Sequence, residues 1–251
     1  LDMDRLDYLN RDSFFTGVVE GVINTDRIIN MLTVVDDELV VEAKGIYSIE
    51  KFIMARRLMY WQVYLHKTVL SADRMLTSIL RRAKSLADSG LKLFSTPSLQ
   101  AFLERKHTHS GPCGADCLLD FANLDDDDII ASVKAWTDAS DPILSTLCNN
   151  LVSRRLFRVE MQGEPFDPGY VERIREQTMK MFSLTPEEAG YFVIPDTVTN
   201  NAYNPKHDRI RILTRDNRLF DVAEASEQLN ISVLSSEVRK HVLCYPKNLS
   251  I

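Results

Sequence analysis

The stretch between Ser48 and Ala87 constrains the fold of this chain more than any other segment. It reads SIEKFIMARRLMYWQVYLHKTVLSADRMLTSILRRAKSLA, and its apolar residues recur close to the 3.6-residue period of an α-helix. Glu50 favours a helix N-terminus, and Gly90 is a natural helix stop. At about 1.5 Å per residue the stretch predicts a rod of roughly 60 Å, with a bend or break near Ser71. The apolar positions are Phe52, Met59, Val63, Leu70, Leu76, Ile79, Leu80 and Ala83.

Shorter elements are expected on both sides of this stretch. The segment from Leu1 to Arg11 reads as helical, and Asn24 with Thr25 supplies an N-cap for DRIINML. TVVDDELVVEAKG predicts two short strands around an Asp-Asp turn. Further along, SLQAFLERK, LDDDDIIASVKAWTD and DPILSTLCNNLVSRR each predict a helix, the last with Pro142 in its first turn. Residues 1–155 are therefore expected to form a mainly α lobe.

The pattern changes after residue 155. LFRVEMQG, GYFVIPDTVT and RKHVLCYP read as strands, and DRIRILTRDNRLFDV reads as a hairpin with Asp-Asn at its turn. DPGYVERIREQTMKMFS and VAEASEQL read as helices. The resulting β-α-β-β-α-β order predicts a small ferredoxin-like α+β lobe over residues 156–251.

The composition is that of a water-soluble globular protein. Of the 251 residues, 45% are hydrophobic and 26% are charged, and the net charge of -6 gives no general attraction to nucleic acid or anionic membrane. Several arginines nevertheless occur in adjacent pairs, so the sequence is compatible with a local basic patch. No apolar run approaches the roughly 20 residues of a membrane helix, and no signal peptide is visible. With only four cysteines, we expect a reducing, cytoplasmic setting and no membrane partner.

The opening helix carries the first candidate site. Asp4, Tyr8, Arg11 and Asp12 share one face of it, with Arg5 beside them. Carboxylate oxygens on a rigid helix suit a metal ion, and Arg and Tyr donors beside it suit a phosphate. The ordinary alternative to a metal or phosphate site is a solvent-exposed helix face with ion pairs between successive turns.

The second candidate is ARRLMYWQVYLHKT. Arg56, Tyr60, Tyr64 and Lys67 form a stripe along the predicted long helix. Arg and Tyr at this spacing can clamp a phosphate and stack on a sugar or base. The ordinary alternative is an amphipathic core helix with snorkelling arginines and buried aromatic rings.

Taken together, these motifs resemble a known family. DMDRLDYLNRDSFFTG, ARRLMYWQVYLHKT, LDDDDIIASVKAW and SRRLFRV follow one another as in the HD-domain phosphohydrolases of the deoxynucleoside triphosphate triphosphohydrolase (dGTPase-like) type. The resemblance extends over nearly the whole chain. It implies an HD-domain-like helical lobe, with residues 1–155 as the C-terminal portion of the catalytic domain. The implied reaction is metal-dependent hydrolysis of a (deoxy)nucleoside triphosphate to nucleoside and triphosphate, and the implied partner is that nucleotide.

The resemblance also implies roles for four residues of the opening helix. Asp4 matches the last metal ligand of the family, which completes a set made by a His and a His-Asp pair. Arg5 matches a basic residue that contacts phosphate. Tyr8 and Asp12 match residues that touch phosphate and sugar. The implied cofactor is one divalent ion, and the resemblance does not distinguish Mg, Mn, Fe, Ni and Zn.

On the long helix the resemblance implies three further substrate-binding positions. Arg56 matches an arginine that binds the phosphate tail, and Tyr64 matches a tyrosine that packs on the sugar and helps to exclude ribose. Tyr60 lies at the base-facing position one turn earlier. Leu65 stands where a polar residue often touches the sugar hydroxyl, so the choice between ribose and deoxyribose stays open.

The histidine ligands that name the family do not precede Asp4, and the pair His207-Asp208 lies between expected strands, where we interpret it as coincidental. We therefore expect the chain to be the C-terminal part of a longer enzyme and to be inactive by itself. Because the family is commonly oligomeric, and because the long helix carries more apolar and aromatic surface than one buried stripe needs, we also expect homo-oligomers.

Several alternatives remain at this point. HTHSGPCGADC offers His107, His109, Cys113 and Cys117 as zinc ligands, although a loop without metal fits its compact spacing better. The acidic run that starts at Asp125 lacks the pattern of a calcium loop and suits a helix N-cap. For the whole chain, the rivals are a non-catalytic nucleotide-sensing module and a single-stranded nucleic-acid binder. The acidic balance argues against the second rival.

Overall fold

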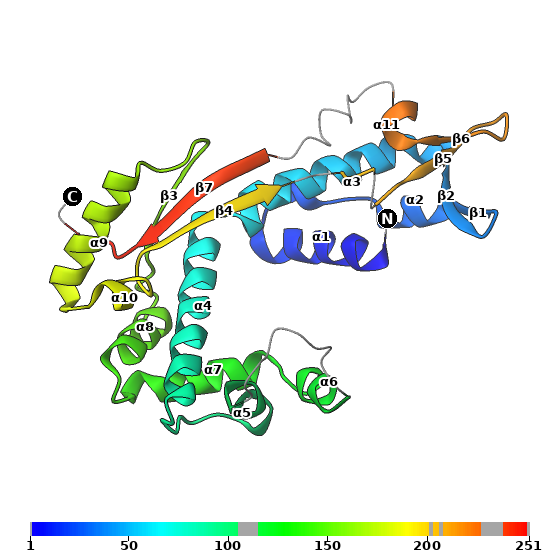
Figure 1. Ribbon diagram of the computed structural model, residues 1–251. Coiled ribbons are helices and arrows are strands. Elements are labelled where there is room, and N and C mark those ends of the chain that lie inside the picture. Colours follow the sequence, from blue (N-terminus) through cyan, green and yellow to red (C-terminus); the bar gives the residue numbers. More distant parts are fainter. Residues whose placement is uncertain (1, 105–114, 201–202, 206–207, 227–237, 250–251) are drawn as a thin grey trace. The chain divides into compact units, whose positions relative to one another are not determined.

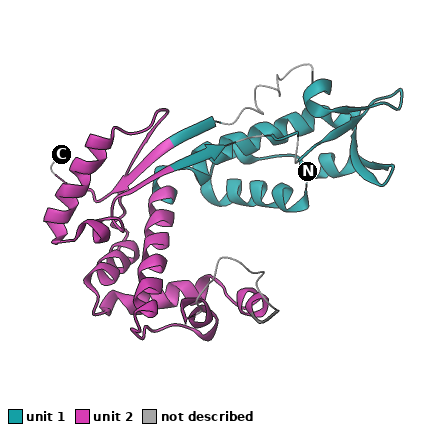
Figure 2. Cartoon of the chain, viewed as in Figure 1, with its two compact units in different colours: residues 1–69, 197–240 teal, residues 70–196, 241–251 magenta. Residues whose placement is uncertain are grey.

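The structure is a computed structural model that describes residues 2–104, 115–200, 203–205, 208–226 and 238–249 (Figure 1). The chain forms two compact units, coloured separately in Figure 2. Unit 1 comprises Leu1–Val69 and Thr197–Lys240, and unit 2 comprises Leu70–Asp196 and His241–Ile251. This division does not coincide with a boundary at residue 155, because the C-terminal third of the chain contributes to both units.

Unit 1 opens with the helix that the sequence predicts. Helix α1 (Met3–Thr16) begins at Asp2, whose carboxylate accepts the backbone N–H of Arg5 at 2.8 Å. It ends at Gly17, which adopts a left-handed φ of 72° and closes the last turn. The 3-10 turn Val19–Gly21 follows, and then helix α2 (Thr25–Asn30), which is capped by Asn24 as expected.

A four-stranded sheet completes unit 1. Strands β1 (Leu32–Val35) and β2 (Glu38–Glu42) form the expected hairpin around Asp36 and Asp37, both of which have positive φ. Strands β5 (Arg211–Leu213) and β6 (Leu219–Asp221) form the second expected hairpin. The sheet order is β1-β2-β5-β6, with β5 parallel to β2, and helix α11 (Val222–Ala225) follows β6.

The long predicted helix is divided, and it breaks at a different place from the one expected. Helix α3 (Ile46–Met59) follows the 3-10 turn Ala43–Gly45 and runs into the π-helix Tyr60–Tyr64. There the backbone N–H of Leu65 reaches the carbonyl of Tyr60, five residues back, at 2.7 Å. His66 then accepts the N–H of Thr68 at 3.2 Å, as an N-cap does, and helix α4 (Lys67–Asp88) starts.

Ser71, where the break was expected, lies inside α4. Its hydroxyl donates to the carbonyl of Phe157 at 3.1 Å, so it satisfies a strand-end acceptor and leaves the helix intact. The break expected near Ser71 therefore falls earlier, between the π-helix and the start of α4. The predicted stop at Gly90 is confirmed by its φ of 90°.

Unit 2 contains the remaining predicted helices. They are α5 (Pro97–Glu104), α7 (Asp126–Ala135) and α8 (Pro142–Val152), with the 3-10 turn Trp136–Asp138 between the last two. Helix α6 (Ala115–Ala122), which the sequence analysis did not predict, lies between α5 and α7 in sequence. Asp125 forms a capping box with Asp128 at the start of α7, so the N-cap interpretation of the acidic run is confirmed. Asp141 caps α8 and also forms an ion pair with Arg82 of α4.

A three-stranded sheet with the order β3-β7-β4 accompanies these helices. Its strands are β3 (Arg158–Gln162), β4 (Ile194–Asn200) and β7 (Val238–Tyr245), and β3 pairs antiparallel with β7. Helix α9 (Pro168–Phe182) and the short helix α10 (Pro186–Ala189) lie between β3 and β4 in sequence. Buried Ile174, Val193, Leu243 and Tyr245 form a core of this region.

The expected fold class is confirmed, with one change in its topology. Helices dominate the chain, and residues 156–251 carry the expected mixture of strands and helices. These strands divide between two sheets, because β5 pairs with β2 of the N-terminal hairpin. They therefore do not make the single four-stranded sheet of a ferredoxin-like lobe. Among the described helices, none combines the length and apolar character needed to cross a membrane.

Candidate functional site

Helix α1 presents one side to the core and another to the candidate site. Leu6, Leu9 and Ser13 are buried and anchor the helix against α3, where Phe52 and Met59 belong to the same core cluster. The 3-10 turn after α1 approaches Met59 so closely that a side-chain Cβ at Gly21 would lie 2.7 Å from the Met59 sulfur. This packing fixes α1 beside α3 although the two helices are separated in sequence.

The structure brings five of the sequence-predicted site residues together, and we call them the tyrosine cluster. They are Tyr8, Asp12, Arg56, Tyr60 and Tyr64. The Tyr64 hydroxyl donates to Asp12 Oδ2 at 2.8 Å. The Tyr64 ring meets Tyr8 edge-on with 6.0 Å between centroids, and it meets Tyr60 edge-on with 5.3 Å between centroids. The π-helix carries both Tyr60 and Tyr64 to this contact.

Arg56 belongs to the same cluster. Its guanidinium carbon lies 5.8 Å from the centroid of the Tyr60 ring, which is cation–π distance. Its charge also acts on Tyr8, whose pKa it lowers in opposition to burial. Arg56 therefore lies on the side of α3 that faces Tyr8 of α1.

Arg5 is held by an acidic residue from far along the chain. Its guanidinium forms ion pairs with Asp2 at 3.2 Å and with Asp208 at 3.1 Å. Burial alone would lower the pKa of Arg5, but the hydrogen bond and the charge of Asp208 outweigh that effect and raise it. The predicted phosphate-contacting arginine is thus already paired with carboxylates.

Two tyrosines of the cluster, Tyr8 and Tyr64, stay protonated near neutral pH. Burial is the largest cause that raises the pKa of Tyr64, and its hydrogen bond to Asp12 raises it further. Burial also raises the pKa of Tyr8, and the neighbouring Tyr60 adds to this effect. These hydroxyl groups are accordingly hydrogen-bond donors near neutral pH and do not act as bases.

Asp4 lies in the first turn of α1, one turn before Tyr8, with an exposed side chain. Within the described ranges, no three His, Cys, Asp or Glu side chains are grouped so that they could hold a metal ion. Catalytic metal sites use about three or more protein ligands. The described residues therefore do not make a metal site by themselves, and Asp4 offers one carboxylate.

Reasoning from the sequence missed Asp208. The pair His207-Asp208 was interpreted as coincidental, yet Asp208 reaches Arg5 across about two hundred residues of sequence. No local pattern signals such a contact, because it depends on how the segment after β4 returns to α1. His207 lies outside the described residues.

The zinc hypothesis for the loop stays a prediction. Three of its four candidate ligands, His107, His109 and Cys113, lie outside the described residues. Cys117 lies in α6 and is disulfide-bonded, so in this state it does not offer a thiolate.

The chemistry of this region follows from its charges, its hydrogen-bond donors and its aromatic rings. Arg5 and Arg56 supply fixed positive charge, and three phenol groups supply both donors and flat apolar faces. Positive forks match phosphate oxygens, and aromatic faces pack against sugars and bases. The arrangement therefore suits a phosphorylated, ring-bearing molecule.

Comparisons with known proteins point the same way. Residues 23–106, which include Arg56, Tyr60 and Tyr64, match the family described as HD associated region. A phosphohydrolase from Bacteroides thetaiotaomicron with a crystal structure is 49% identical, with a TM-score of 0.87 over 98% of this chain and 61% of that chain. The protein YwfO of Bacillus subtilis is 33% identical over 99% of this chain and 56% of its own length.

A more distant match covers a shorter segment. The deoxynucleoside triphosphate triphosphohydrolase SAMHD1 homolog of Dictyostelium discoideum is 30% identical over 83 residues, which are 33% of this chain and 16% of that protein. The chain spans little more than half the length of YwfO and of the Bacteroides phosphohydrolase. Together the matches support an HD phosphohydrolase family as the class of this protein.

Proposed function

We propose that this chain is the part of an HD-type nucleoside triphosphate phosphohydrolase that grips the phosphates and the sugar of the substrate. The observation that carries the proposal is the convergence of Tyr8, Asp12, Arg56, Tyr60 and Tyr64 from two helices. The similarity to a phosphohydrolase over 98% of this chain supports the reaction class. The match to a deoxynucleoside triphosphate triphosphohydrolase homolog supports the substrate class.

In the proposed reaction, water attacks the phosphate next to the nucleoside. The bond between that phosphorus and the sugar oxygen breaks, and nucleoside and triphosphate leave. Arg56 and Arg5 neutralise the charge of the phosphate chain, and fixed positive donors of this kind stabilise the charge that develops during the reaction. Tyr64 packs on the sugar, held in place through its bond to Asp12.

The proposal assigns Asp4 one ligand position of a divalent metal. Because Asp4 is one exposed carboxylate, the other ligands come from a part of the protein that precedes it in the family pattern. We therefore propose that a longer protein is the active form. A metal of this kind lowers the pKa of bound water.

The test compares two proteins: the 251-residue chain, and the same chain extended at its N-terminus by the segment encoded before Leu1. Triphosphate release is measured from a panel of ribo- and deoxynucleoside triphosphates with magnesium or manganese. We expect turnover by the longer protein, loss of turnover in its Asp4→Ala variant, and none by the shorter chain. The shorter chain could instead show robust turnover that the Asp4→Ala substitution abolishes. That result would refute the proposal that the other metal ligands lie outside the 251-residue chain.

A third result would point to the sensing alternative. If nucleotides raise the melting temperature of the longer protein but no metal in the panel supports turnover, the tyrosine cluster senses nucleotide without hydrolysing it. The binding part of the proposal would then stand, and the catalytic part would be wrong.

We also propose that the longer protein self-associates. Phe14, Phe15 and Val19 are 81%, 78% and 74% exposed in unit 1, and exposed apolar side chains of this size gather at interfaces. Sedimentation at micromolar concentration tests this. An oligomer is expected, and a monomer would contradict it.

A further inference from the structure

The Arg5 guanidinium is held by carboxylates along two of its edges. Its Nε lies 3.2 Å from Asp2, which is the N-cap of the same helix. Its terminal nitrogens Nη1 and Nη2 lie 3.1 Å and 3.5 Å from the two carboxylate oxygens of Asp208. The fork of an arginine takes a carboxylate and a phosphate in the same two-point geometry. Asp208 therefore occupies the end of Arg5 that a phosphate would use.

Asp208 is presented by a segment that the core of unit 1 holds in place. Tyr203 is buried, and its hydroxyl donates to Asp221 Oδ2 at 2.7 Å and accepts the backbone N–H of Ile210 at 3.0 Å. The N–H of Asp208 donates to the carbonyl of Asn204 at 2.8 Å. We call Tyr203, Asn204, Asp208 and Ile210 the clasp. Because Tyr203 and Ile210 are buried on either side of Asp208 in sequence, its carboxylate reaches α1 from a fixed base.

Arg5 acts on the same part of the tyrosine cluster as Arg56. Burial is the largest cause that raises the pKa of Tyr8, and the charges of Arg56 and Arg5 both act to lower it. The two guanidinium groups therefore lie near one ring. Asp208 is only partly buried, so its side chain can leave Arg5 without opening the core beneath the clasp.

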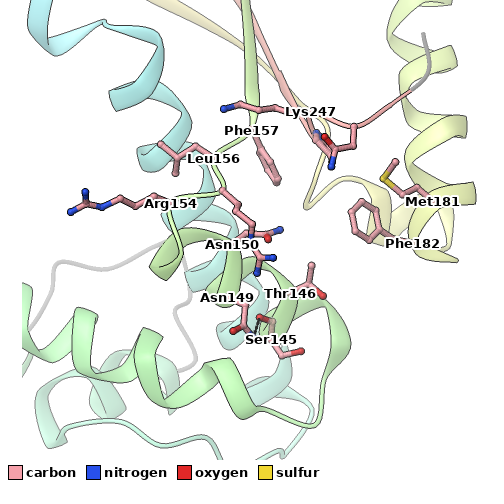
Figure 3. Close-up of a pocket in the computed structure, with 13 residues that line it drawn as sticks. Ser145, Thr146, Asn149, Asn150, Arg154, Leu156, Phe157, Met181, Phe182 and Lys247 are labelled. Atoms are coloured by element: carbon pink, nitrogen blue, oxygen red, sulfur yellow. Dashed lines mark hydrogen bonds between the residues drawn. The ribbon is translucent and has the colours of Figure 1, made fainter.

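Three cations of unit 2 show the opposite arrangement. Arg154, Arg155 and Lys247 line a cavity of about 770 Å³, and within the described part of the chain none of the three forms an ion pair with a carboxylate. Figure 3 shows the side chain of Arg154 pointing away from the other labelled side chains. Cations in this state attract any anion. Arg5, in contrast, is covered by carboxylates before a ligand arrives.

We propose that the clasp is an autoinhibitory contact, in which Asp208 occupies the phosphate-binding end of Arg5 until the triphosphate of the substrate displaces it. The inference rests on the proposed function, in which Arg5 neutralises the phosphate chain. With two carboxylates beside it, Arg5 presents no net positive charge, so a weak anion is not attracted to it. A triphosphate that Arg56 already holds competes for Arg5 at a high effective concentration and takes the place of the Asp208 carboxylate.

The test measures the affinity for a deoxynucleoside triphosphate by calorimetry in the longer protein, with Asp4→Ala as the background that blocks turnover. Asp208→Asn keeps the shape of the side chain and removes its charge, so the affinity is expected to rise about two- to fivefold. Asp216→Asn is the matched control, because it removes the same charge from unit 1 at a residue that pairs with Arg218. An equal rise in both variants would show that only overall charge matters and would overturn the proposal.

A double-variant cycle shows whether Asp208 acts through Arg5. The clasp predicts that Asp208→Asn raises the affinity when Arg5 is present. It predicts little effect in the Arg5→Ala background, because the competition for Arg5 is then lost. A purely structural role of Asp208, or direct repulsion of the phosphates, would give the same change in both backgrounds, and the proposal would then be wrong.

The same titrations separate this inference from the proposed function. If the background protein does not bind the triphosphate, the proposed function is wrong, and the clasp falls with it. In another outcome the background protein binds, Arg56→Ala weakens binding, and Asp208→Asn lowers the affinity or leaves it unchanged. The clasp would then be wrong, and the proposed function would stand.

Discussion

The two units hold their arginines in different ways. In unit 1, Arg5 lies between Asp2 and Asp208, and Arg56 lies beside the Tyr60 ring. In unit 2, Arg154 and Arg155 end α8 beside a cavity without a lining carboxylate. Partnered cations are pre-oriented but must exchange their partners when a phosphate arrives. Unpaired cations need no exchange, but their orientation depends on the ligand.

The largest effect is expected from Arg56→Ala in the longer protein. Removing a fixed positive donor from a phosphate site costs about 100-fold in kcat/KM. Stability should change little, because a cation–π contact at a partly exposed site contributes about 0.5–1 kcal/mol. Arg57→Ala on the same helix is the control and should keep full activity. If both variants lose activity equally, Arg56 has no special place in the site.

A smaller effect is expected from Tyr64→Phe, which keeps the ring and removes the bond to Asp12. Loss of one hydrogen bond to a charged group lowers the free energy of unfolding by about 1.5–3 kcal/mol, and partial exposure brings this to the lower end. Chemical denaturation of the 251-residue chain measures it. Asp12→Asn and the double variant complete a cycle, and additive losses would show that the two side chains do not cooperate.

The Asp208→Asn variant tests the effect of releasing Arg5 from its ion pair. It releases Arg5 from a pair whose side chains are 24% and 34% exposed, and such pairs contribute about 0–1 kcal/mol. Affinity of the longer protein for a triphosphate should therefore rise up to about fivefold. Calorimetry with the Asp4→Ala background, which blocks turnover, measures it. A weaker affinity would mean that Asp208 orients Arg5 for the ligand.

The smallest expected effect is on the pH dependence of stability, through the ion pair between Arg82 and Asp141 in unit 2. Burial alone would raise the pKa of Asp141, but the Arg82 guanidinium and the backbone N–H of Leu144 outweigh it and lower that pKa below its ordinary 3.8. The carboxylate is therefore favoured in the folded state. Its contribution to stability is present above the ordinary pKa and is lost as pH falls through the lowered one.

Asp141→Asn isolates this effect, because an asparagine still caps α8 but carries no charge. Thermal unfolding of the parent between about pH 6 and pH 2 should lose stability more steeply than that of the variant. Parallel curves would show that the ion pair does not stabilise the fold.

Local sequence patterns predicted the elements whose stability is local. Asn24 caps α2 and Asp125 caps α7, because one side chain satisfies backbone groups within its own turn. The hairpin at Asp36 and Asp37 is also local, because both residues adopt the positive φ of a two-residue turn. The motif DMDRLDYLNRDSFFTG on α1 likewise placed Tyr8 and Asp12 on one side of a helix, and the structure brings both to Tyr64.

Features set by distant partners escaped prediction. Nothing in DRIRILTRDNRLFDV shows that its first strand pairs in parallel with β2. Ser71 looks like a helix breaker, but it is satisfied by Phe157, and the break falls where His66 caps the next helix. Asp208 reaches Arg5 only through the tertiary fold. For the strand pairing, for Ser71 and for Arg5, the deciding group is far away in sequence.

The most direct test of the account is a crystal structure of the longer protein with a non-hydrolysable deoxynucleoside triphosphate analogue. We predict phosphate oxygens within hydrogen-bond distance, about 2.7–3.2 Å, of Arg5 and Arg56, with the sugar against the Tyr64 ring. An analogue bound with its phosphates away from both arginines and its sugar away from the Tyr64 ring would contradict the central claim that the tyrosine cluster grips the substrate.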